Sequence, residues 1–271
     1  MELPFSTWYP TIDIRRSRRQ FDPSRPIEPD ILNKLRTFCQ EFKPFPHARA
    51  ELVSESPNKV FKGAIGPYGK IKDAQAFIAF IGDMSSPHSQ EETGYTGEGI
   101  ILEATSLQLA TCWVGGFFKP DVAKSLIRTS ANEKILAVTP IGYAKQTLTK
   151  EEKLMMGFGW NKQRKPLSNL ATGIRILDWP EWVKVSLEAA RLAPSAVNRQ
   201  PWGFHIEPEV ITVLVRNTGS EFSISKRLDC GIAMLHIDIA AQSQGIHGEW
   251  EFMEAPYVAR FRIKSTGKST N

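Results

Sequence analysis

Cysteine and histidine are both scarce in this chain of 271 residues. The three cysteines are an odd number without CxxC spacing, which excludes a disulfide framework and a cysteine zinc site; they are Cys39, Cys112 and Cys230. The five histidines form no HxxxH or HExxH pattern, so no metal is expected; they are His47, His88, His205, His236 and His247. A chain without disulfides is expected in the reducing cytoplasm.

Long hydrophobic runs are also lacking. The longest nearly uncharged apolar stretches, such as 74–82, fall far short of the roughly 20 residues of a membrane-spanning helix, and segment 1–19 has no signal-peptide core. The chain is 41% hydrophobic and 23% charged, which is typical of a globular protein with one large domain or two halves. Its net charge of +5 suits an anionic small ligand as well as nucleic acid, but no known nucleic-acid module accompanies the charge.

Hydrophobic spacing and turn residues predict alternating helices and strands. Helices are expected from about residue 30, over 100–114, from 119, over 182–192 and over 231–244. Strands are expected over 50–53, 135–144, 204–206 and 210–215, with 74–81 either a buried strand or an apolar helical turn. Segment 62–72 is predicted to be a loop, and segment 145–170 a basic surface segment or linker. Each half has a helix, a strand and then a helix opening on Gly-Ile, at Gly99 and Gly231, which suggests an internal duplication.

The first motif is the basic run from Arg15 to Phe21, RRSRRQF. Four guanidinium groups around the hydroxyl of Ser17 could hold a phosphate through charge-assisted hydrogen bonds. A solvated basic face, or a nuclear-localisation or nucleic-acid patch, would show the same residues. The run alone does not separate these interpretations.

The second motif follows a helix and reads APSAVNRQPWGF over 193–204. It presents the hydroxyl of Ser195 and the amides of Asn198 and Gln200 within six residues. Such a loop could bond a polar heteroaromatic edge and a polyol. A turn whose amides satisfy their own backbone is the alternative.

The complete string resembles the signature loop of the nitroreductase family of flavin oxidoreductases, in which APS is followed by Asn and then by QPW. The family's N-terminal pattern R-x-S-x-[KR]-x-F is matched by Arg15, Ser17, Arg19 and Phe21. Three further parts are similar: the glycine turn at Gly115 and Gly116, the basic segment with Lys162 and Arg164, and Lys70. The resemblance spans residues 15 to 204 and implies an α+β nitroreductase-like fold, with a mixed or antiparallel sheet in each of two related halves.

The order of these parts departs from the family. A family subunit carries all of them, whereas this chain has the R-x-S-x-R pattern and the basic segment in its first half and the QPW loop in its second half. The family forms homodimers with flavin at the subunit interface. The expected arrangement is therefore a fused pseudo-dimer with halves 1–170 and 171–271, acting as a monomer and binding one FMN between them.

The resemblance also implies the chemistry: FMN takes electrons from NADH or NADPH and passes them to a small oxidised acceptor. It assigns the anionic end of FMN to Arg15, Arg19, Lys162 and Arg164, with Ser17 as a further donor. Lys70 is expected near the pyrimidine edge of the flavin, and Gly115 and Gly116 near N5. The QPW loop is expected to contact the ribityl chain and ring through Pro194, Ser195, Asn198 and Gln200. No protein side chain is expected to transfer a proton. A flavin-binding protein without turnover is the main alternative, and a nucleic-acid binder is the least favoured.

Overall fold

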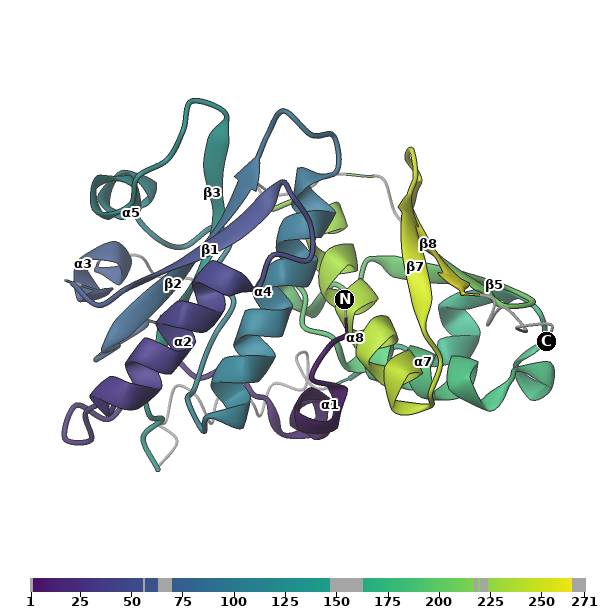
Figure 1. Ribbon diagram of the computed structural model, residues 1–271, viewed down its shortest axis with the longest axis horizontal. Coiled ribbons are helices and arrows are strands. Elements are labelled where there is room, and N and C mark those ends of the chain that lie inside the picture. The colour runs from purple at the N-terminus through teal and green to yellow at the C-terminus, as the bar shows by residue number, and fades with distance from the viewer. Residues whose placement is uncertain are drawn as a thin grey trace, which may run out of the picture.

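The computed structural model describes residues 2–55, 57–62, 70–146, 163–216, 219 and 224–264. They form an α+β fold in which two sheets lie on either side of two central helices, α4 and α8 (Figure 1). The helices are α1 (Phe5–Ile14), α2 (Pro29–Glu41), α3 (Pro57–Phe61), α4 (Ser89–Ser106), α5 (Pro120–Leu126), α7 (Glu181–Leu192) and α8 (Lys226–Ser243). The strands are β1 (Ala48–Val53), β2 (Ala76–Asp83), β3 (Glu133–Ile141), β4 (Ala171–Gly173), β5 (Trp202–Glu207), β6 (Val210–Val215), β7 (Gly248–Phe252) and β8 (Tyr257–Ile263).

The first sheet has the order β1-β2-β3 and is antiparallel. Its middle strand β2 is buried on both faces. Ile78 and Phe80 point into the large core that contains α4, whereas Phe77 and Ile81 point into a smaller cluster beneath α3 and α5. Because successive side chains of a strand point to opposite faces, covering both faces requires the continuous apolar sequence AFIAFIG. This explains why β2 shows no alternation between apolar and polar residues.

The second sheet has the order β4-β5-β6-β8-β7 and is antiparallel except for the pair β4–β5. Strand β5 begins at the fully buried Trp202 and continues with the equally buried Phe204. Both side chains lie in the large core together with residues of α7 and α8. The loop that precedes β5 is therefore anchored directly to the core.

Helices α4 and α8 pack against each other through glycine. A Cβ atom on Gly94 would overlap the carbonyl oxygen of Leu228 and lie 3.0 Å from its carbonyl carbon. A Cβ atom on Gly231 would overlap the carbonyl oxygen of Glu91 and lie 2.8 Å from its carbonyl carbon. The two contacts are reciprocal, since Leu228 and Glu91 each precede one of these glycines by three residues. The sequence suggested that Gly99 corresponds to Gly231. This was wrong for the helix contact, because Gly94 makes the contact reciprocal to that of Gly231, whereas Gly99 packs against Phe42.

The prediction for α4 was wrong at both ends. The helix covers Ser89–Ser106 and not 100–114. It is followed by Gln108 with a φ of 62°, and Ala110 and Val114 then pair with Gly142 and Val138 as isolated bridges beside β3. Helix α8 likewise starts five residues before the predicted Gly231, at a cap where Ser225 accepts a hydrogen bond from the Arg227 backbone N–H. Much of the predicted basic segment and of the predicted loop lies outside the described residues.

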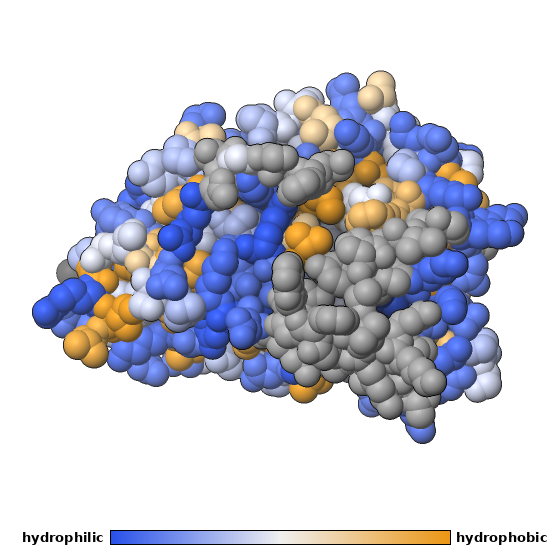
Figure 2. Space-filling model, turned by 180° about the vertical axis from the view of Figure 1, so that it is seen from behind, coloured by the Kyte–Doolittle hydropathy of each residue, from blue (hydrophilic) through white to orange (hydrophobic). Residues whose placement is uncertain are grey.

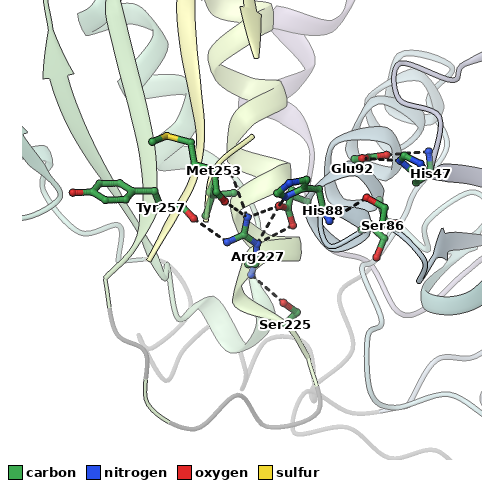
Figure 3. Close-up of polar contacts among 12 residues, drawn as sticks. His47, Ser86, His88, Glu92, Ser225, Arg227, Met253 and Tyr257 are labelled. Atoms are coloured by element: carbon green, nitrogen blue, oxygen red, sulfur yellow. Dashed lines mark hydrogen bonds and ion pairs between the residues drawn. The ribbon is translucent and has the colours of Figure 1, made fainter. Parts of the chain in front are cut away.

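A polar cluster joins the beginnings of α4 and α8 (Figure 3). The Arg227 guanidinium donates to the buried Glu91 carboxylate and to the backbone oxygens of Tyr257 and Met253, at 2.8 and 2.9 Å. His88 Nδ1 also lies 3.0 Å from Glu91. The cluster therefore ties the β7–β8 turn to both central helices.

Figure 2 shows the surface from the side opposite to that in Figure 1. Hydrophilic residues cover most of the coloured surface there, and apolar residues appear in separate smaller patches. Among the described residues, seven large apolar side chains are exposed: Ile14, Met84, Phe117, Ile176, Leu177, Val197 and Tyr257. Most of the other described large apolar side chains are buried or half-buried, consistent with burial as the main driving force for this fold.

Candidate functional site

The loop between α7 and β5 has an unusual backbone. Val197, Asn198 and Gln200 have φ angles of 48°, 55° and 48°, in the left-handed region that non-glycine residues rarely adopt. Each such residue costs about 1–3 kcal/mol and persists only where its surroundings enforce it. Here Asp229 of α8 enforces it, accepting hydrogen bonds from the Ala196 backbone N–H at 3.1 Å and from Arg199 Nε at 2.7 Å. Strain of this kind concentrates at ligand sites.

The same loop contacts the basic segment that precedes β4. Arg164 donates to Asn198 Oδ1 at 3.0 Å and to the carbonyl oxygens of Leu192 and Ala193, both at 2.8 Å. These carbonyls lie at the C-terminal end of α7, where a cation is favoured. The structure thus brings together Arg164 and Asn198, two predicted site residues that are far apart in sequence.

Two other predicted residues of this loop contact the chain itself. The Gln200 amide accepts from the Lys165 backbone N–H at 2.8 Å and donates to the Gln163 carbonyl at 3.1 Å. Ser195 Oγ accepts from the Gln200 backbone N–H at 3.0 Å. Ser195 and Gln200 therefore shape the loop, and Pro194 is buried at its start.

Arginine side chains converge beside this loop. Burial, followed by the like charges of Arg15, Arg191 and Arg16, lowers the pKa of Arg164 to about 10. Arg15 is only 8% exposed, and its buried Nη1 atom has no hydrogen-bond partner among the described residues. A buried donor without a partner is costly, as is a cluster of like charges. An anion bound here would offset both costs.

One buried carboxylate connects this cluster to the second half. Glu98 of α4 is fully buried and accepts from Trp113 Nε1 at 2.7 Å. Its other oxygen lies 3.0 Å from His236 Nε2 of α8 and 3.9 Å from Arg15 Nε. The sequence interpretation gave neither Glu98 nor His236 a role in the site, because no local pattern distinguishes Glu98 from the other three glutamates of α4.

Three other predicted site residues of the first half lie on two segments that contact each other or Thr111: Ser17, Arg19 and Lys70. Ser17 is exposed and forms a parallel bridge with Thr111. The Arg19 carbonyl accepts from the Lys72 backbone N–H at 3.0 Å. Lys70 is exposed, and its carbonyl accepts from the Gln20 amide at 2.9 Å. Ser17 and Arg19 thus lie on one segment, and Lys70 lies on the neighbouring segment that pairs with it; Lys162 lies outside the described residues.

The glycine turn faces the second half of the chain. A Cβ atom on Gly115 would lie 3.1 Å from the side chain of Ile224, and one on Gly116 would lie 3.6 Å from it. Ile224 just precedes α8, and its carbonyl accepts from Arg199 in the QPW loop at 2.9 Å. Gly115 and Gly116 therefore lie where the two halves meet, close to the strained loop.

Within the ranges that the structure describes, no group of three or more His, Cys, Asp or Glu residues could hold a metal ion. Of the described helices, none has the length and apolar character to cross a membrane.

Comparisons with known proteins identify the family. The chain matches no curated protein. A crystal structure of a putative nitroreductase from Thermotoga maritima is similar over 97% of this chain and 94% of its own, with a TM-score of 0.63 and 17% identity, which shows the fold. A nitroreductase family protein from Clostridium difficile has a TM-score of 0.43 and 23% identity over 61% of this chain and 93% of its own. A nitroreductase with bound FMN from Bacteroides fragilis has a TM-score of 0.41 and 21% identity over 53% and 91%. The family model described as "Putative TM nitroreductase" matches residues 7–241, so the chain belongs to this nitroreductase family.

Proposed function

We propose that the chain is an FMN-dependent oxidoreductase that takes two electrons from NADH or NADPH and passes them to a small oxidised acceptor. Membership of the nitroreductase family supports an oxidoreductase. The observation that carries the cofactor assignment is the buried Arg15, whose Nη1 atom lacks a partner among the described residues. It belongs to an arginine cluster beside the strained loop that bears the family motif.

The residues present fit an anionic cofactor. Arg15 and Arg164 would bind its phosphate, because guanidinium groups match phosphate geometry and their mutual repulsion is relieved by an anion. When bound, FMN supplies reversible two-electron chemistry. Gly115 and Gly116 would allow its ring to approach the backbone closely.

The other predicted residues would act around this cluster. Arg19, Lys162 and Ser17 would add donors for the phosphate. Lys70 would supply a positive charge near the pyrimidine edge of the flavin. Asn198 would orient Arg164 toward the cofactor, and the contacts of Ser195 and Gln200 would keep the loop in its strained form.

We further propose that one FMN lies between halves 1–170 and 171–271, which act together as a pseudo-dimer. The reciprocal glycine contacts of α4 and α8 support this relation. So do Glu92 and Asp229, each two residues before one of these glycines. Asp229 accepts from the loop before β5, and Glu92 accepts from the His47 backbone N–H, before β1, at 3.0 Å (Figure 3). Equivalent carboxylates thus hold equivalent loops.

The loop before β1 differs from its counterpart in a way that favours a single site. Where the second half has its polar motif, the first half reads FKPFPH over 42–47. Phe45 of this loop packs edge-on against Tyr95 and Phe252, with centroid distances of 5.0 and 5.1 Å. His88 stacks on the same Phe252 ring at 5.0 Å. Aromatic packing therefore occupies the place that corresponds to the ligand loop.

The experiment that tests the proposal is flavin quantification after denaturation of protein reconstituted with FMN, followed by anaerobic addition of NADH or NADPH. About one FMN per chain, bleached by either nucleotide, is expected. Two FMN per chain would refute the single composite site. Failure to bind FMN would refute the cofactor assignment, and binding without bleaching would favour the flavin-binding alternative.

A further inference from the structure

The contacts of His236 define where its protons lie. Its ring is fully buried, with Nδ1 2.8 Å from the Ala189 carbonyl oxygen and Nε2 3.0 Å from Glu98 Oε1. A carbonyl oxygen can only accept, so Nδ1 must carry a proton. The contact between Nε2 and Glu98 then requires a second proton, carried either by the ring or by the carboxyl group.

The surroundings of Glu98 place that second proton on the ring. Trp113 Nε1 donates to one carboxylate oxygen at 2.7 Å, and the Arg15 guanidinium lies 3.9 Å from the other. Arg164 is close enough for its pKa to be affected by the Glu98 charge. A donor and two cations all stabilise the ionised carboxylate. These contacts fit an imidazolium at His236 paired with the Glu98 carboxylate.

This pairing has a consequence for Arg15. The 3.9 Å between Arg15 Nε and Glu98 is too long for a hydrogen bond, whereas His236 and Trp113 are both within hydrogen-bond distance of the carboxylate. Arg15 is left buried, with its Nη1 atom unpaired among the described residues. If His236 were neutral and lost this contact, Glu98 would be free to take Arg15 as its partner.

We propose that His236 is a positioning residue for cofactor binding: as an imidazolium it pairs with Glu98 and thereby leaves the Arg15 guanidinium available for the anionic end of FMN. The inference rests on the proposed function, since it assumes that FMN is the ligand of Arg15. It gives His236, a side chain of helix α8 in the second half, a role in cofactor binding by Arg15 of the first half. His236 itself need not contact the cofactor.

The test compares dissociation constants for FMN and for riboflavin, which lacks the phosphate. His236→Gln keeps a donor near Glu98 but removes the positive charge, so FMN affinity should fall by about tenfold to one-hundredfold, the range of a lost charge-assisted hydrogen bond. Riboflavin affinity should change by less than about threefold, because riboflavin has no phosphate for Arg15 to bind. His205→Gln, a half-buried histidine of β5 bonded to Thr172, is the matched control and should behave as the wild type.

The double variant Glu98→Gln/His236→Gln distinguishes positioning from simple structural damage. Without the Glu98 carboxylate, this competitor for Arg15 is removed, so FMN affinity should return to within about threefold of the wild type. A double variant as weak as His236→Gln, or an equal loss of riboflavin affinity, would overturn the inference.

A direct readout uses the unaltered protein. Nitrogen NMR of histidine-labelled protein should show both His236 ring nitrogens protonated near neutral pH, and a neutral ring would overturn the inference even if His236→Gln failed to fold. The outcomes also separate the two proposals. Wild-type protein that does not bind FMN refutes the proposed function, whereas wild-type binding that is unaffected by His236→Gln refutes only the role of His236.

Discussion

Substitution of Gly94 by alanine tests whether the two halves are held as closely as the structure shows. The new methyl group would overlap the Leu228 carbonyl oxygen and lie 3.0 Å from the carbonyl carbon, where about 3.5–4.0 Å is the favourable separation between carbon atoms. The obstruction is backbone inside helix α8, so no side-chain rotation can relieve it. The helices would have to separate along their whole contact.

The expected magnitude is the difference between two opposing effects. Overpacking a rigid interface costs about 3 kcal/mol at the upper end of its usual range. Replacing glycine by alanine inside a helix contributes about 1 kcal/mol in the opposite direction. The net loss of unfolding free energy should be about 2 kcal/mol or more.

The assay is urea unfolding followed by tryptophan fluorescence, with FMN affinity measured on the same samples. Gly231→Ala should lose a similar amount, because its contact with Glu91 is the reciprocal one. Gly116→Ala is a stability control, since among the described residues its methyl group would meet only Ile224, at an ordinary 3.6 Å. Unchanged stability of Gly94→Ala and Gly231→Ala would refute the close packing. Loss of stability without loss of FMN affinity would refute dependence of the site on both halves.

Three further predictions concern the site and the first sheet. Asn198→Gly keeps the left-handed backbone but removes the hydrogen bond to Arg164. The free energy of FMN binding, measured by flavin fluorescence titration, should therefore weaken by about 1 kcal/mol, and unchanged affinity would contradict the role of the loop. Val197→Gly removes a β-branched residue from a half-exposed position with a φ of 48°. The free energy of unfolding should therefore rise by about 1 kcal/mol, and a decrease would contradict the assigned strain. The hydrogen bond from Arg49 lowers the pKa of Glu133 from 4.5 to about 2, so this group stabilises the fold above about pH 4.5 and loses that contribution as the pH falls toward 2. Glu133→Gln should therefore show a smaller acid-induced loss of stability than the wild type, and identical pH profiles would contradict the pairing.

The sequence predicted elements well where local signals agree with packing. Strand β6 has the predicted bounds, Val210–Val215, because it is a short apolar run between turns. Helix α7 begins one residue before the predicted start and ends at the predicted Leu192, ahead of Pro194. Strand β2 was left undecided between strand and helix, since a segment buried on both faces has no periodicity to read.

The failures occur where tertiary packing overrides local signals. Gly99 was read as a helix opening, yet it lies inside α4, where Phe42 comes too close for a side chain; Gly94 and Gly97 of the same helix lie similarly close to Leu228 and Trp113. Helix α1 and strands β7 and β8 were not predicted at all. The family motif located the loop and the arginine cluster, but not Glu98 and His236, because neither belongs to a local pattern and their pairing depends on how α4 and α8 cross.

The α4–α8 contact joins two parts of one polypeptide, and this changes how the site responds to dilution. A site shared between separate subunits disappears when the subunits dissociate, whereas here the covalent connection gives the partner surface a fixed effective concentration. The halves are also free to diverge, since a mutation in one is not copied into the other. In the proposed pseudo-dimer, the loop over 42–47 serves aromatic packing, whereas its counterpart carries the polar motif. Under that proposal, one chain uses one half-site for the ligand and the other for stability.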